Sequence, residues 1–126
     1  MTLVKDLMRR PVTLPEETAE MGMVEAQMKL ANVRHVLLVD AAGRLSGILS
    51  RGDLMRVADA DHHHSVKEYM TRRLFTVRPE APAVGALDLL LEHGVGAVPV
   101  VDGEHVPVGL VSEVDYLQVA RRALAG

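Results

Sequence analysis

Each half of the chain repeats one order of apolar and polar positions. In the first half, four apolar residues recur at the spacing of one helical face, namely Met21, Val24, Met28 and Ala31. Thr18 is the candidate N-cap of this helix. An apolar run over 36–39 is typical of a buried strand, and a polar turn over 40–43 leads into a second strand over 44–49. A closing helix is expected from about Arg51.

The second half follows the same order. The helical stripe comprises Val84, Leu87 and Leu91, and Gly94 ends the helix. An apolar strand over 98–101, a turn over 102–104 and a strand over 106–111 follow, and a closing helix begins near Glu113. Each half is therefore predicted to run short helix, short strand, helix, strand, strand, helix.

The two halves are also duplicates at the level of individual residues. Residues 66–70 repeat residues 4–8 at a distance of 62 positions, and the same distance relates the matches 36–40 with 98–102, 47–50 with 109–112, Asp53 with Asp115, and 57–58 with 119–120. We therefore predict repeat 1 over 1–61, a linker over 62–65 and repeat 2 over 66–126. A half of about 60 residues buries too little surface alone, so the repeats are expected to share one core around a pseudo-twofold axis.

Composition excludes several classes of function. The 126 residues carry a net charge of −3 and only three aromatic side chains, so neither a basic footprint nor a stacking platform for nucleic acid is present. The chain has no cysteine, which excludes disulfides and thiolate chemistry. No apolar run approaches the roughly 20 residues that cross a bilayer, and the first residues do not form a signal core. We expect a cytoplasmic protein without a membrane partner.

The histidines do not indicate catalysis or a metal site. His35, His93 and His105 are scattered, and no spacing suggests a nucleophile with its base. His62–His64 lie near Asp59 and Asp61, but neighbouring residues point in different directions on a helix and no second ligand set appears. We predict a polar linker, no metal, no required cofactor and no enzymatic activity.

Two junctions between a strand and a helix are candidate binding sites. Ser50 and Asp53 stand at the first junction, and Ser112 and Asp115 stand at the second. A serine hydroxyl and free helix amides can donate to a phosphate, and a carboxylate can accept from both hydroxyls of a ribose cis-diol. The same spacing is also that of a helix capping box. Binding and capping both remain open.

These motifs resemble the cystathionine-β-synthase (CBS) domain family over nearly the whole chain. The resemblance rests on Met8 with 11–13, on 39–40 and Gly43, on 47–54, and, in the second half, on 70–71, 75–77, 98–102 and 109–115. It implies an α/β (α+β) fold of two tandem βαββα repeats, with small sheets packed against helices. It also implies a regulatory module that binds AMP, ADP, ATP or S-adenosylmethionine in clefts between the repeats, forms a homodimer and signals to an unknown effector protein. The alternative is a ligand-free interaction module with vestigial clefts.

The resemblance further implies that each cleft mixes the two repeats. Cleft one would combine Ile48, Ser50, Arg51 and Asp53 with Thr71, Phe75, Val95, Gly96 and Ala97. Cleft two would combine Leu110, Ser112 and Asp115 with Arg9, Val12, Val33, Arg34 and His35. Arg51 could attract a phosphate, and Arg34 and His35 could as well, whereas Glu113 would repel one. We therefore expect cleft one to be the better site for a phosphorylated ligand.

Overall fold

The chain folds into two compact units, which a computed structural model describes over residues 1–57 and 61–126. Unit 1 comprises Met1–Arg10 and Phe75–Gly126, and unit 2 comprises Pro11–Leu74. Each unit therefore contains the opening segment of the other sequence repeat: residues 1–10 of repeat 1 lie in unit 1, and residues 66–74 of repeat 2 lie in unit 2. The boundaries at 61 and 66 describe the duplication, and as a division into domains they stay a prediction. Ala58 and Asp59, used in the sequence analysis, lie outside the described residues.

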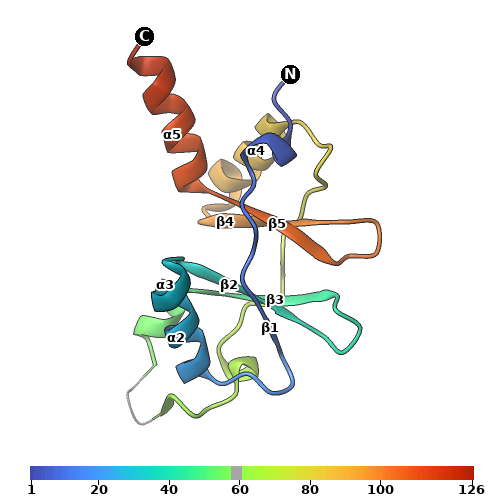
Figure 1. Ribbon diagram of the computed structural model, residues 1–126, viewed down its shortest axis with the longest axis vertical. Coiled ribbons are helices and arrows are strands. Elements are labelled where there is room, and N and C mark those ends of the chain that lie inside the picture. Colours follow the sequence, from blue (N-terminus) through green and yellow to red (C-terminus); the bar gives the residue numbers. More distant parts are fainter. Residues whose placement is uncertain (58–60) are drawn as a thin grey trace. The chain divides into compact units, whose positions relative to one another are not determined.

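Unit 2 is a three-stranded sheet with helices packed beside it (Figure 1). Its strands β1 (Thr13–Pro15), β2 (His35–Val39) and β3 (Leu45–Ser50) lie in that order, with β1 parallel and β3 antiparallel to β2. The helices are α2 (Met21–Ala31), α3 (Arg51–Met55) and the short 3₁₀ helix η2 (Val66–Glu68). The strands predicted over 36–39 and 44–49 and the helix start at Arg51 are confirmed.

The inward face of α2 follows the predicted stripe. Met21, Val24 and Met28 are buried in the core of unit 2, together with Val36, Leu38 and Leu49 from the strands. Ala31, at the end of the stripe, is exposed. Burial of such side chains contributes about 1.5–3 kcal/mol each, so this face holds α2 on the sheet.

The predicted N-cap of α2 is wrong. Thr18 lies in a turn before the helix, which begins at Met21 with Glu20 as its N-cap. The first amides of the helix need acceptors, and the linker provides them: Met21 N–H donates to the carbonyl of His64 at 3.0 Å, and Gly22 N–H donates to that of His62 at 2.6 Å. Hydrogen bonds to these two linker carbonyls thus take the place of the predicted cap by the Thr18 side chain.

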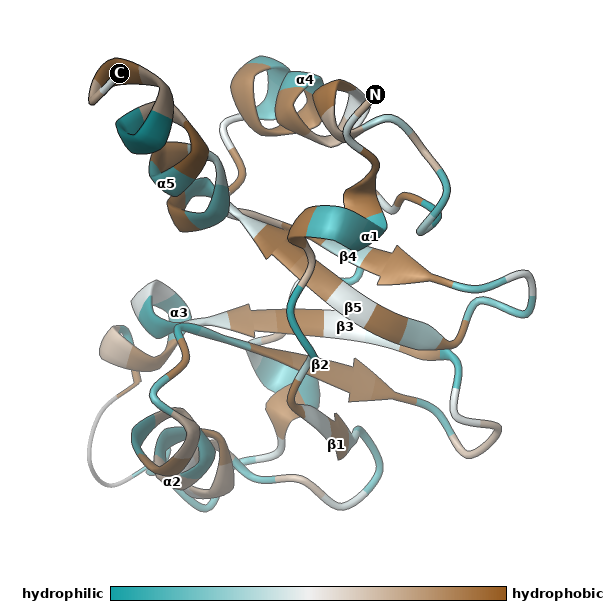
Figure 2. Ribbon diagram, turned by 45° about the horizontal axis from the view of Figure 1, so that its top comes forward, coloured by the Kyte–Doolittle hydropathy of each residue, from teal (hydrophilic) through white to brown (hydrophobic). Residues whose placement is uncertain are grey.

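Unit 1 contains a hairpin and three helices. Strands β4 (Ala97–Val101) and β5 (Pro107–Ser112) are antiparallel, and the helices are α1 (Val4–Leu7), α4 (Ala83–His93) and α5 (Glu113–Leu124). Figure 2 shows the largely hydrophobic strands of this hairpin. The second copy of the short first strand is reduced to a single bridge between Val77 and Val100. The predicted strands and the start of α5 are confirmed.

The apolar stripe predicted for α4 does not face the core of unit 1. Val84 and Leu91 are 60% and 74% exposed, and the buried positions are Ala83, Ala86 and Leu90. Nearly every turn of this helix carries apolar residues on more than one side, so packing decides the inward face. The exposed stripe is thus available for a contact outside the unit.

Both hairpins turn at an aspartate, as the sequence predicts. Asp40 Oδ1 accepts from the amides of Ala42 and Arg44, each at 2.9 Å. Asp102 Oδ1 accepts from the amides of Val106 and Glu104, and these two hydrogen bonds hold the pKa of Asp102 below its ordinary value. An aspartate that accepts from amides two and four residues on favours the turn over an extended chain.

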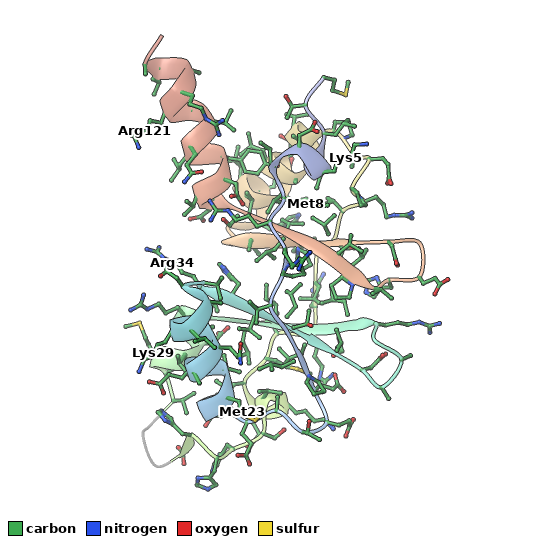
Figure 3. The ribbon with its side chains drawn as sticks, in the orientation of Figure 1. Lys5, Met8, Met23, Lys29, Arg34 and Arg121 are labelled. Atoms are coloured by element: carbon green, nitrogen blue, oxygen red, sulfur yellow. The ribbon has the colours of Figure 1, made fainter. Side chains whose placement is uncertain are left out.

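A methionine locks each opening segment onto a glycine of the unit that it joins. In unit 1, Met8 (labelled in Figure 3) lies against Gly109 of β5, and in unit 2 Met70 lies against Gly47 of β3. A Cβ built on Gly109 would lie 2.5 Å from Met8 Sδ, and one on Gly47 would lie 2.6 Å from Met70 Sδ. The methionine and the glycine that recur in the two sequence repeats therefore contact each other in the same way in each unit.

Candidate functional site: two strand-to-helix junctions

The first junction is built by Ser50 and Asp53 in unit 2. Asp53 Oδ2 accepts from the Ser50 amide at 2.7 Å and from Ser50 Oγ at 2.9 Å, and the Asp53 amide lies 3.1 Å from Ser50 Oγ. Asp53 Oδ1 contacts Arg56, the C-cap residue that follows α3, and the aspartate is 9% exposed. The serine and aspartate therefore form a closed capping box with an arginine on its outer oxygen.

The second junction, in unit 1, repeats the hydrogen bonds that the aspartate carboxylate accepts from the serine. Asp115 Oδ2 accepts from the Ser112 amide at 2.8 Å and from Ser112 Oγ at 3.2 Å, and the aspartate is 6% exposed. Its Oδ1 accepts from Arg9 Nε at 2.8 Å. An arginine again holds the outer oxygen, but here it comes from the opening segment of the chain.

Tyr116 fixes the start of α5 beside this junction. Its hydroxyl donates to the carbonyl of Ala83 in α4 at 2.6 Å. Burial raises the pKa of Tyr116, and the neighbouring Asp115 charge raises it further. The phenol therefore stays a donor at neutral pH and anchors the first turn of α5.

The capping interpretation is confirmed in both directions at Ser50 and Asp53, and at Ser112 and Asp115 by the carboxylate that accepts from the N-cap amide. The carboxylates are not held by their own backbone alone, because each also pairs with an arginine. One oxygen of each carboxylate serves the cap, and the other is held by a side chain that can move. Capping therefore leaves Oδ1 as an acceptor that another donor could take.

Each junction lies beside the start of the neighbouring strand in the same unit. In unit 2, His35 pairs with Ser50 across β2 and β3, and the Arg51 amide donates to the Arg34 carbonyl at 2.8 Å. In unit 1, Ala97 pairs with Ser112, and the Glu113 amide donates to the Gly96 carbonyl at 3.1 Å. The cleft residues predicted from the sequence do not include these combinations.

The opening segments also reach the junctions. Thr71 and Ile48 exchange two backbone hydrogen bonds of 3.0 Å in unit 2, and Arg9 and Leu110 exchange two of 3.0 Å in unit 1. Five predicted residues of cleft one thus lie in unit 2 and four of cleft two in unit 1: Ile48, Ser50, Arg51, Asp53 and Thr71, and Leu110, Ser112, Asp115 and Arg9.

The remaining predicted site residues do not lie in the same unit as the junction with which the resemblance combined them. Val12, Val33, Arg34 and His35 lie in unit 2, and Phe75, Val95, Gly96 and Ala97 lie in unit 1. Their combination with the junction of the other unit stays a prediction.

Three side chains near these residues were missed. Arg56 and Gln118 contact the two junctions, since Gln118 Oε1 lies 3.4 Å from Arg9 Nη2. Arg56 could have been found by its position three residues after Asp53 on a helix. His93 stacks on Phe75 with ring centroids 3.9 Å apart, and no spacing in the sequence indicates that contact.

The histidine linker contacts carboxylates. His62 Nδ1 lies 3.3 Å from Glu25, and His64 lies 3.3 Å from Asp61 and 3.2 Å from Glu68. A hydrogen bond and the charge from Lys29 lower the pKa of Glu25. Within 1–57 and 61–126, no group of three or more histidine, aspartate or glutamate side chains could hold a metal ion.

None of the helices in the described part of the chain has the length and apolar character needed to cross a membrane.

Comparison with known proteins identifies relatives for the whole chain. A family model described as CBS domain matches residues 4–60 and again 66–122. L-aspartate semialdehyde sulfurtransferase of Methanocaldococcus jannaschii is 30% identical over 115 residues, which are 90% of this chain and 22% of that protein. The chain thus spans about a fifth of the length of this curated relative.

Two solved structures are similar in fold. The CBS domain pair of protein MJ0100, solved in complex with 5-methylthioadenosine and S-adenosyl-L-methionine, has a TM-score of 0.88 and 27% identity, with 98% of each chain covered. The cytosolic domain of the Mg²⁺ channel MgtE, solved in complex with ATP, has a TM-score of 0.77 and 28% identity, covering 90% of this chain and 46% of that one.

Proposed function

Because the chain belongs to the CBS domain family, we propose that it is a regulatory module whose Ser-x-x-Asp junctions bind the ribose of an adenosine-type ligand. One observation carries the proposal: both units present a buried aspartate whose Oδ2 serves a cap and whose Oδ1 is paired, among the described residues, with one exposed arginine. The candidates are AMP, ADP, ATP and S-adenosylmethionine. The adenosine ligands in the solved structures of two relatives support this choice.

The junction supplies the chemistry that such a ligand needs. The outer carboxylate oxygen can accept from a ribose hydroxyl, and the displaced guanidinium can donate to an anionic group. Binding of this kind needs no reactive residue, so we propose no enzymatic activity. We propose a regulatory role in the cytoplasm. A ligand shifts the conformation of the chain only by its difference in affinity for two states, and a partner protein would detect that shift.

Ligand titration tests the proposal. AMP, ADP, ATP and S-adenosylmethionine are added separately to the purified chain, and both melting temperature and heat of binding are measured. A ligand that binds the folded state should raise the melting temperature as its concentration rises. Asp53→Asn and Asp115→Asn should each lower the affinity of the site that they alter, because a hydrogen bond to a charged acceptor is lost; for a phosphorylated ligand the loss should be larger, about tenfold, for Asp53→Asn.

Asp88→Asn, an exposed change in α4, is the matched control and should leave affinity unchanged. If no ligand binds the wild type, the ligand-free interaction module becomes the better description. If both junction variants lose equal affinity for a phosphorylated ligand, the predicted preference for cleft one is wrong.

We also propose that a second copy of the chain covers α5. After Tyr116 every residue of this helix is exposed, including Leu117, Val119 and Leu124, and Figure 2 shows hydrophobic positions along its length. Apolar side chains gathered on one helix indicate a contact surface. Leu117→Glu should shift the sedimentation equilibrium towards monomer, whereas Arg121→Glu on the same helix keeps a polar residue and should change it less. A monomeric wild type would contradict this proposal.

A further inference from the structure

The two junctions take their arginines from different elements. Position 9 of the opening segment is Arg in unit 1, and its repeat equivalent in unit 2 is Thr71. The helix position three residues after the aspartate shows the reverse choice, Gln118 in unit 1 and Arg56 in unit 2. Each aspartate nevertheless has one arginine on Oδ1. Both junctions therefore have an arginine at Oδ1, but the two arginines stand at positions that are not equivalent in the two repeats.

Arg9 is held by its backbone and free to move only at its side chain. Its amide and carbonyl both bond to Leu110 at 3.0 Å, which makes it part of the strand pairing beside β5. Its side chain is 61% exposed, while the Asp115 that it contacts is 6% exposed. The guanidinium can therefore leave Asp115 for solvent or for a ligand without any movement of the backbone.

A ribose and this guanidinium compete for the same acceptor. Oδ2 of Asp115 already accepts from the amide and hydroxyl of Ser112, so a ribose that uses this carboxylate competes with Arg9 for Oδ1. A neutral nucleoside gives the displaced guanidinium no new partner. A ligand with a phosphate beside the ribose gives it one, through a hydrogen bond between two charged groups.

We infer that Arg9 is a specificity-determining residue of unit 1, which holds Asp115 in the empty site and turns to an anionic group when a ribose takes its place. The inference rests on the proposed function and names the ligand class as a phosphorylated nucleoside. Glu113 alone would disfavour a phosphate at this junction. Arg9 supplies the charge that offsets it.

The test compares adenosine with AMP at the unit 1 junction. Dissociation constants are measured from the backbone amide NMR signals of 112–116, which report on this junction and not on that of unit 2. Wild type should bind AMP more tightly than adenosine. Arg9→Thr, which copies unit 2, should weaken AMP about tenfold and leave adenosine equal or tighter, because the competitor for Oδ1 is gone.

A second variant transfers the arginine. Adding Gln118→Arg to Arg9→Thr copies the full pattern of unit 2 and should restore part of the AMP preference. Arg9→Lys keeps the charge and should retain more of that preference than Arg9→Thr. A thermal melt of each variant checks that it is folded.

The outcomes separate the inference from the proposed function. If AMP and adenosine bind wild type and Arg9→Thr with the same ratio of affinities, the role of Arg9 is overturned and ligand binding stands. If neither ligand moves the signals of 112–116 in wild type, binding at this junction and the role of Arg9 are both overturned.

Discussion

Val4→Asp should lower the free energy of unfolding by about 4 kcal/mol, because it places an unpaired carboxylate in the core of unit 1. Val4 is fully buried against Ala86, Leu90, Val98, Val100 and Val111, although by sequence it opens the first repeat. Its amide also donates to the Ala81 carbonyl at 2.8 Å. Hydrogen exchange should therefore show the larger loss of protection in β4 and β5, and the smaller one in β2 and β3.

Lys5→Asp is the matched control, since it adds the same carboxylate one residue later on the exposed side of α1 (Lys5 is labelled in Figure 3). Its effect should stay within about 0.5 kcal/mol. Urea unfolding gives both values. Loss of protection mainly in β2 and β3 of Val4→Asp would show that residues 1–10 do not belong to unit 1.

The local elements of this fold could be predicted from the sequence because their signals are local. The strands over 36–39 and 98–101 are short apolar runs between turn residues, and the turns are set by Asp40 and Asp102. The starts of α3 and α5 follow from the Ser-x-x-Asp spacing, whose capping contacts need only four neighbouring residues.

What the sequence missed depends on contacts between distant segments. The N-cap of α2 is displaced from Thr18 because carbonyls of the 62–64 linker accept from the first amides of the helix. The inward face of α4 is set by packing, since several of its sides are apolar. The ion pair of Arg9 with Asp115 joins residues 106 positions apart, which only the family resemblance had grouped in cleft two. Periodicity contains no information about such pairs.

The exchange of opening segments explains why the site was predicted only in part. Sequence repeats assign residues 1–10 to the first half, but their contacts assign them to the second. The resemblance to the CBS domain family placed Arg9 with Asp115 in cleft two, and the two side chains pair in unit 1. The aspartates could be predicted from their repeated motif, whereas their ion pairs with Arg9 and Arg56 were not predicted.

Gly109→Ala should destabilise the protein by about 2 kcal/mol, because the new methyl group would overlap Met8. Its Cβ would lie 2.5 Å from Met8 Sδ, 3.0 Å from Cγ and 3.1 Å from Cβ. The last of these atoms is fixed to the backbone, so rotation of the Met8 side chain cannot relieve the whole contact. The lower entropy of the unfolded alanine chain offsets at most about 1 kcal/mol.

Gly47→Ala is the matched control in unit 2. There the three atoms nearest the new Cβ are Met70 Sδ, Cγ and Cε, at 2.6, 3.1 and 3.3 Å. These atoms can rotate away, so the cost should be smaller, about 1 kcal/mol. Met8→Ala should partly rescue Gly109→Ala, and the double variant should lose less stability in urea than the sum of the two single changes. Additive losses would mean that Met8 and Gly109 do not share the contact, and the opening segment would then not be locked onto β5 at this point.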